Sequence, residues 1–154
     1  MPVIGAFDAG ECVIDRGKPG RGDGRIAARQ TAGLPQNLFH LLPHGAGEQK
    51  SGVTLTAGSD FHERREIIGR VAQVYLVIEG GPGTQHEAAV AAAQGAALIP
   101  LGRTGGWAGT LHARMSCPEV LAKDDWELLA EVDAPHEQVV GAVGRLVRAA
   151  LIAA

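Results

Sequence analysis

Apolar residues fall into blocks along the chain, and the blocks differ in their spacing. Consecutive apolar residues, typical of strands that are buried on both faces, predict strands over residues 73–78 and 96–101. A similar run predicts a strand over residues 2–7. Weaker apolar stretches bounded by turn residues predict further strands over residues 37–42 and 52–57.

Helical spacing of apolar residues separates and follows these strands. One helix is expected to begin at Asp60, with Glu63 three residues later, and the last helix is expected to be capped by Asp133, with Pro135 in its first turn. Residues 84–94 form an alanine-rich helical segment. The remaining expectations are a loop over residues 9–24, short helices over 25–33, 107–115 and 118–123, and a brief segment over 126–132.

This order of elements predicts the fold class. Strands that alternate with helices and are apolar throughout are typical of an α/β protein in which helices cover both faces of a mostly parallel sheet. The length of 154 residues suits a single domain, residues 1–154. In such sheets, ligands bind beyond the carboxyl ends of the strands.

Composition supports a compact soluble protein and narrows its partners. The chain is 45% hydrophobic and 20% charged, which argues against disorder, and its net charge of −3 with 4% aromatic residues gives no basis for nucleic-acid binding. We find no signal peptide or membrane span, and Cys12 and Cys117 lack the spacing of a metal or redox pair. We therefore expect a cytoplasmic protein with reduced thiols, and neither nucleic acid nor membrane as partner.

The strongest chemical signal follows the apolar run at residues 74–78. The chain there reads Glu-Gly-Gly-Pro-Gly-Thr and enters the alanine-rich helix. Glycines let the backbone approach a ligand closely, and the first turn of a helix carries about half a positive charge. The segment predicts an anion site, and a nucleotide phosphate is the anion that this pattern favours.

Two motifs resemble those of a known family. The sequence Asp-Phe-His-Glu-Arg-Arg at residues 60–65 and the sequence Gly-Gly-Pro-Gly-Thr-Gln-His-Glu at residues 80–87 resemble the MHERK and PGGxGTxxE signatures of the lonely-guy family, long labelled possible lysine decarboxylases. Members are Rossmann-like homodimers, and characterised ones are phosphoribohydrolases that release the base from cytokinin riboside 5′-monophosphates. The resemblance implies a Rossmann-like three-layer α/β/α fold, a homodimer and an AMP-like ligand, with no cofactor and no metal.

The resemblance also implies roles for particular residues. Glu87 corresponds to the catalytic carboxylate, which would stabilise the oxocarbenium-like sugar or activate water. Arg64 would clamp a phosphate or hold that carboxylate, and its charge is expected to lower the pKa of Glu87. The phosphate itself would be held by Gly80, Gly81, Gly83 and Thr84.

The chain departs from the family in two ways. Glu79 stands where the family has proline, which places an acid beside the phosphate loop. The predicted strand at residues 2–7 corresponds to the family's third strand, so the sheet lacks the first two strands. Either the chain is an N-terminally shortened member, or it is adapted to a smaller sheet.

A second glycine-rich loop follows the next strand. Residues 102–106 read Gly-Arg-Thr-Gly-Gly, and in a parallel sheet they would lie beside the first loop. Arg103 and Thr104 are therefore candidate ligand contacts, with an ordinary turn as the alternative. The first loop also has a purely local interpretation, because Thr84 and Glu87 have the spacing of a capping box.

Three hypotheses follow for function. The first is a phosphoribohydrolase that hydrolyses the N-glycosidic bond of purine nucleoside 5′-monophosphates, with Arg64 and Glu87 as catalytic residues. The second is a noncatalytic domain that binds or senses a nucleotide. The third is a shortened, inactive scaffold that dimerises.

Overall fold

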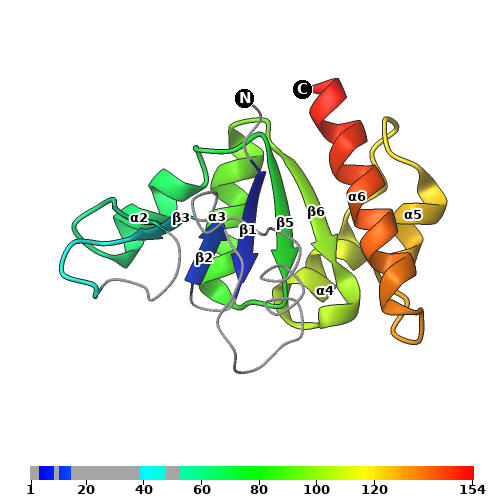
Figure 1. Ribbon diagram of the computed structural model, residues 1–154, viewed down its shortest axis with the longest axis horizontal. Coiled ribbons are helices and arrows are strands. Elements are labelled where there is room, and N and C mark those ends of the chain that lie inside the picture. The colour runs from blue at the N-terminus through cyan, green and yellow to red at the C-terminus, as the bar shows by residue number, and fades with distance from the viewer. Residues whose placement is uncertain (1–3, 9–10, 15–38, 48–52) are drawn as a thin grey trace.

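The computed structural model describes residues 4–8, 11–14, 39–47 and 53–154. Within them, six strands form a single sheet in the order β4-β3-β2-β1-β5-β6, and helices flank it (Figure 1). The α/β class predicted from the sequence is confirmed. The helical segment expected over residues 25–33 lies outside the described residues.

The sheet is mixed. The strands β1 (Ile4–Asp8), β5 (Val74–Ile78) and β6 (Ala97–Leu101) run parallel to one another, and β3 (Phe39–Leu42) runs parallel to β4 (Val53–Thr56). Between these two groups lies β2 (Glu11–Ile14), which is antiparallel to both of its neighbours. The expected loop over residues 9–24 therefore contains a strand. Four residues with a charged first position gave too short an apolar run for the pattern to predict it.

Two hydrophobic clusters lie on opposite faces of β5 and β6, because successive side chains of a strand point to opposite sides. Tyr75, Val77 and Leu98 belong to the first cluster, together with residues of α2 (Phe61–Ile68), α3 (Pro82–Ala93) and α4 (Gly106–Arg114). Val74 and Ile99 belong to the second, together with residues of α5 (Lys123–Leu128) and α6 (His136–Ala153). Helices thus cover both faces of this part of the sheet.

The starts of the helices test the capping predictions. Asp60 caps α2 as expected, with its carboxylate accepting from the Glu63 N–H at 2.8 Å, while Glu63 accepts from Ser59 instead of returning the bond to Asp60. The predicted cap of the last helix is wrong, since Pro135 is the N-cap residue of α6 and no side chain bonds its first turn. Asp133 lies outside that helix.

Helix boundaries between residues 118 and 132 also differ from expectation. The expected helix over 118–123 is absent, and α5 begins at Lys123 and ends at Leu128. Two acidic residues in its first turn, Asp124 and Asp125, suit a helix start. The hydrophobic spacing alone did not separate these short segments, because a helix of six residues shows little periodicity.

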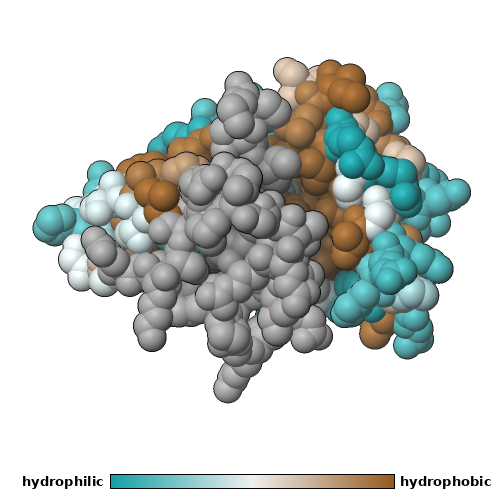
Figure 2. Space-filling model, in the orientation of Figure 1, coloured by the Kyte–Doolittle hydropathy of each residue, from teal (hydrophilic) through white to brown (hydrophobic). Residues whose placement is uncertain are grey.

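The carboxyl-terminal helix α6 is the most amphipathic. Its buried face consists of Val139, Ala142, Leu146, Val147 and Ala150, whereas Val140 and Ile152 are exposed. Figure 2 shows hydrophobic residues over the last turns of this helix. Among the described ranges, no helix has the length and hydropathy that crossing a bilayer requires.

Candidate functional site

The site begins where β5 ends. Gly80 has φ of 86°, and a Cβ atom there would lie 2.4 Å from Oγ1 of Thr84, so the position requires glycine for both conformation and space. Gly81 is the N-cap residue of α3 and Pro82 occupies its first turn. The glycine-rich turn therefore presses closely against the start of the helix that follows it.

The first turn of α3 shows that Thr84 is not a capping residue. The helix begins at Pro82, no side chain caps it, and Thr84 is buried within it. The capping-box interpretation of Thr84 and Glu87 is wrong, because Thr84 is already the third residue of the helix and the Glu87 carboxylate accepts from Arg64. The N–H groups of Gly83 and Thr84 precede the first intrahelical bond, from Gln85 N–H to the Gly81 carbonyl, and helix geometry gives them no intrahelical acceptor.

A cation lies against this helix start. The guanidinium of Arg65 packs on Gly83, so that a Cβ atom on Gly83 would be 3.1 Å from Nε and 3.2 Å from Nη2. Within the described part of the chain, Arg65 has no carboxylate partner. A guanidinium and the positive end of a helix repel each other, so an anion beside them, such as the Glu87 carboxylate or a bound ligand, makes their proximity more favourable.

Sequence reasoning missed Arg65 as a site residue. It follows Arg64 directly in the first motif, so the second arginine of that motif was the available signal. Which of the two arginines would face the glycine loop depends on the rotation of α2, which the motif does not give.

The structure brings Arg64 and Glu87 together. Nη1 of Arg64 is 2.6 Å from Oε1 of Glu87, and both side chains are almost completely buried, with 2% and 4% of their surface exposed. Nε of Arg64 donates to the Leu41 carbonyl at 2.9 Å. The pair thus joins α2 on one side to α3 and β3 on the other.

One hydrogen-bond donor of the Arg64 guanidinium has no acceptor among the described residues. Its Nη2 atom is buried and has no hydrogen-bond partner among the described residues. A buried guanidinium N–H without an acceptor is costly, and such groups are rare in folded proteins. The arrangement therefore leaves a buried donor beside Glu87, in a protein region that also presents Arg65 and the start of α3.

The pKa of Glu87 differs in direction from the sequence expectation. Burial raises the pKa of this carboxyl above its usual range, and the charges of Arg64 and Arg65 offset the effect only in part. Arg64 lowers the pKa of Glu87 as expected, but the desolvation of the buried carboxyl, which the motif does not reveal, outweighs this effect. A raised pKa makes the Glu87 carboxylate a stronger base than that of an exposed glutamate and keeps the group protonated to a higher pH.

The side chains of the second glycine-rich loop form hydrogen bonds with main-chain groups of the protein itself. Gly102–Thr104 form a short 3₁₀ turn, η2, and Oγ1 of Thr104 accepts from the Glu79 N–H at 2.7 Å and donates to the Leu101 carbonyl. Nη1 and Nη2 of Arg103 donate to the carbonyls of Ala134 and Val132 at 2.8 and 2.6 Å. The structure places both predicted ligand contacts in structural hydrogen bonds, so we do not carry Arg103 and Thr104 into the proposed site.

The start of α4 is closed to ligands. The N–H groups of Trp107 and Ala108 donate to the carbonyls of Gly80 and Glu79, each at 2.9 Å. Gly106 fits against Gly80 so closely that a Cβ atom would lie 2.6 Å from the Gly80 carbonyl oxygen. Of these two neighbouring helix starts, that of α3 therefore keeps N–H groups without an acceptor among the described residues.

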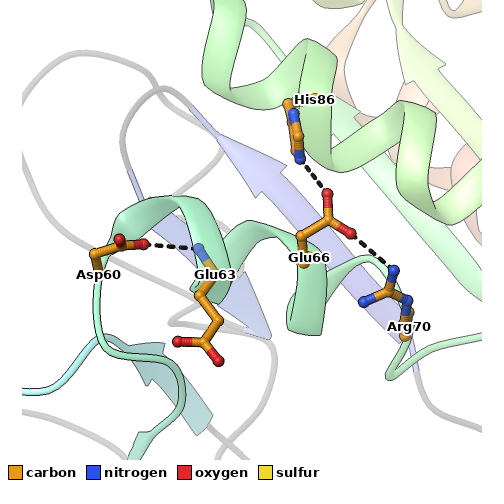
Figure 3. A network of polar contacts seen from close by, with 5 residues as sticks. All are labelled: Asp60, Glu63, Glu66, Arg70 and His86. Carbon is orange, nitrogen blue, oxygen red and sulfur yellow. Dashed lines mark hydrogen bonds and ion pairs between the residues drawn. The ribbon is translucent and has the colours of Figure 1, made fainter.

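A polar network lies beside the buried pair and also joins α2 to α3 (Figure 3). Nε2 of His86 lies 2.6 Å from Oε1 of Glu66, and Nη2 of Arg70 donates to the other carboxylate oxygen at 2.8 Å. The hydrogen bond with His86 is the main cause of the lowered pKa of Glu66. His86 therefore ties the two helices together, and in the described residues no group of three or more potential ligands is placed to hold a metal ion.

Comparisons of the chain with protein-family models, with curated proteins and with solved structures found no match.

Proposed function

We propose that the protein binds a nucleoside 5′-monophosphate, with the phosphate at the start of α3, in a domain of Rossmann-like type. The observation that carries this proposal is the unpartnered buried donor of Arg64, which lies next to Glu87. Further donors at the same helix start are the N–H groups of Gly83 and Thr84 and the guanidinium of Arg65 from α2, which has no ion-pair partner among the described residues. A phosphate dianion supplies the acceptors that these groups lack.

We further propose that the bound nucleotide is hydrolysed at its N-glycosidic bond. The C1′–N bond would break as water attacks C1′, with the bonding electron pair leaving on the base and a proton transferred to the base nitrogen. As a carboxylate, Glu87 would stabilise the positive charge that develops on the sugar and accept a proton from the attacking water, and its raised pKa makes it a stronger base for this step. Arg64 would hold the carboxylate in place through the 2.6 Å contact.

One observation favours the noncatalytic alternative. Arg64 and Glu87 are buried to the same extent as core residues, and a carboxylate that reacts at C1′ must be reached by the sugar. In a binding or sensing domain the same pair would serve only to position α3 against α2. Binding and turnover must therefore be measured separately.

We also propose that the protein forms a homodimer through a groove between α3 and α4. The groove has a volume of about 220 Å³ and is lined by apolar side chains apart from Gln85 at one end. Ala88, Ala89 and Ala92 are spaced along one face of α3, so the backbone of a second helix can approach closely. Light scattering of the full chain tests this, and Ala89→Glu should shift a dimer to monomer.

Two measurements on the full chain test the nucleotide proposal. Calorimetric titration with AMP should give saturable binding, and chromatography of long incubations should detect free adenine. Glu87→Gln should abolish base release and retain AMP binding, because the amide keeps the shape of the side chain. Absence of AMP binding to the wild-type chain removes the proposal, whereas binding without base release leaves the noncatalytic alternative.

A further inference from the structure

We infer that Glu79 sets the number of phosphates that the site accepts, because its carboxylate repels a second phosphate next to the first. This inference rests on the proposed nucleotide binding. It assigns a selective role to a residue whose side chain forms no hydrogen bond or ion pair within the described part of the chain.

The backbone at Glu79 is one that glycine would adopt more easily. Its φ is 52°, and among the described residues no other residue except glycine has a positive φ. Its N–H donates to Thr104 and its carbonyl accepts from Ala108. On the side of Glu79 both bonds use only main-chain atoms, so they hold the conformation but do not require a glutamate side chain. The turn therefore holds Glu79 in a strained backbone conformation, although its side chain takes part in none of the hydrogen bonds that fix the turn.

The position of Glu79 gives the loop an uneven charge. Glu79 is exposed and precedes the N-cap residue Gly81 by two residues, so their Cα atoms are at most about 7 Å apart. Arg65 lies against Gly83, in the first turn of the same helix. The N–H groups at the start of α3 thus have a cation against Gly83 and an acidic residue two positions before the N-cap residue.

This charge pattern suits a single phosphate. One phosphate at the helix start receives the N–H groups and Arg65, and these attractions exceed the repulsion from a solvated carboxylate. A second phosphate extends past the helix start, gains no further N–H donor there, and adds negative charge within reach of Glu79. At 4 Å in water two unit charges interact by about the energy of a fivefold change in affinity, so the expected selectivity is roughly fivefold.

The experiment compares AMP and ADP binding by calorimetry in the absence of divalent ions, for the full chain and three variants. Glu79→Gln removes the charge and should raise the affinity for ADP relative to AMP by roughly fivefold, while Glu79→Asp keeps the charge and should leave the ratio near the wild-type value. Glu119→Gln, in the segment between α4 and α5, makes the same change of net charge elsewhere and should also leave the ratio unchanged. In 1 M salt the difference between wild type and Glu79→Gln should vanish, because charges are screened beyond about 3 Å.

The outcomes separate the inference from the proposal on which it rests. If AMP binds and Glu79→Gln leaves the ADP to AMP ratio unchanged, Glu79 does not select and the inference is overturned while nucleotide binding stands. If neither nucleotide binds the wild-type chain, both fall together.

Discussion

Arg64 and Glu87 form a buried ion pair at 2.6 Å that joins α2 to α3. Each side chain lost its hydration on folding, so each depends on the other for compensation. The pair is therefore both the centre of the proposed site and a structural link between the two helices that form it.

Removal of one partner should destabilise the protein strongly. We expect Arg64→Met to lower the free energy of unfolding by about 3–5 kcal/mol, because it leaves the Glu87 carboxylate buried without a counter-charge. Urea denaturation followed by circular dichroism measures the change. Lys123→Met, which breaks the exposed pair between Lys123 and Glu127, is the matched control and should shift the transition very little. Equal effects of the two substitutions would contradict the buried pair.

Gly83→Asp should affect stability and binding in opposite directions. A carboxylate in the first turn of α3 faces the helix dipole and Arg65, and we expect it to stabilise the fold by about 0.3–1 kcal/mol. The same carboxylate occupies the anion position, so AMP binding should be lost. Thermal denaturation and calorimetric titration give the two values. Gly83→Asn, similar in shape and uncharged, should not stabilise the fold to the same degree; loss of stability in Gly83→Asp alone would argue against an anion site.

The strain at Glu79 gives a prediction that needs no ligand. Glu79→Gly should raise the free energy of unfolding by about 0.5–1 kcal/mol, since glycine adopts positive φ without the penalty of a Cβ atom but loses more chain entropy on folding. Glu79→Ala retains the Cβ atom and should stay near wild type. Chemical denaturation of the three proteins decides this, and a destabilised Glu79→Gly would contradict the strain.

Stability should depend on pH through Glu87 in a direction opposite to that of most carboxylates. Burial raises its pKa in the folded protein above the ordinary 4.5, so between these two values the folded state holds the proton more firmly than the unfolded state does. The unfolding free energy contributed by Glu87 therefore falls as pH rises from about 4.5 through the folded pKa, and the loss is complete above it.

Urea denaturation at a series of pH values for wild type and Glu87→Gln isolates this contribution. The difference between the two curves should change across that window in the stated direction. Glu66 and Asp125, whose pKa values are lowered, contribute to both proteins alike and cancel in the difference. A difference curve that rises with pH would show that Arg64 dominates over burial.

The sequence predicted the elements that carry long, uninterrupted patterns. The apolar run of β5, the following turn and the amphipathic face of α6 each rest on several consecutive residues that favour one structure. The α/β class follows from their order. The short strand β2 was not predicted, and the bounds of the six-residue helix α5 were wrong. Segments of four to six residues are too short for the spacing of their apolar residues to distinguish helix from strand.

The candidate site was predictable in its residue types and not in its contacts. The resemblance of the two motifs suggested that Arg64 and Glu87 act together, and the turn itself suggested an anion. Burial of the pair, which reverses the expected pKa shift of Glu87, depends on the packing of α2, α3 and β3. Arg103 donates to the carbonyls of Val132 and Ala134, which lie about thirty residues later in the sequence. These hydrogen bonds depend on the tertiary packing of that later segment, which local sequence patterns do not predict.

The first turn of α4 fixes which way the loop's peptide groups face. Its N–H groups bond the carbonyls of Glu79 and Gly80, and in a trans peptide the N–H of the next residue points opposite to that carbonyl. The amides of Gly80 and Gly81 are thereby turned away from α4. A ligand that accepts hydrogen bonds from those amides would polarise the same two peptide groups and strengthen the hydrogen bonds that their carbonyls accept from α4. Ligand binding and the attachment of α4 to the loop would therefore reinforce each other.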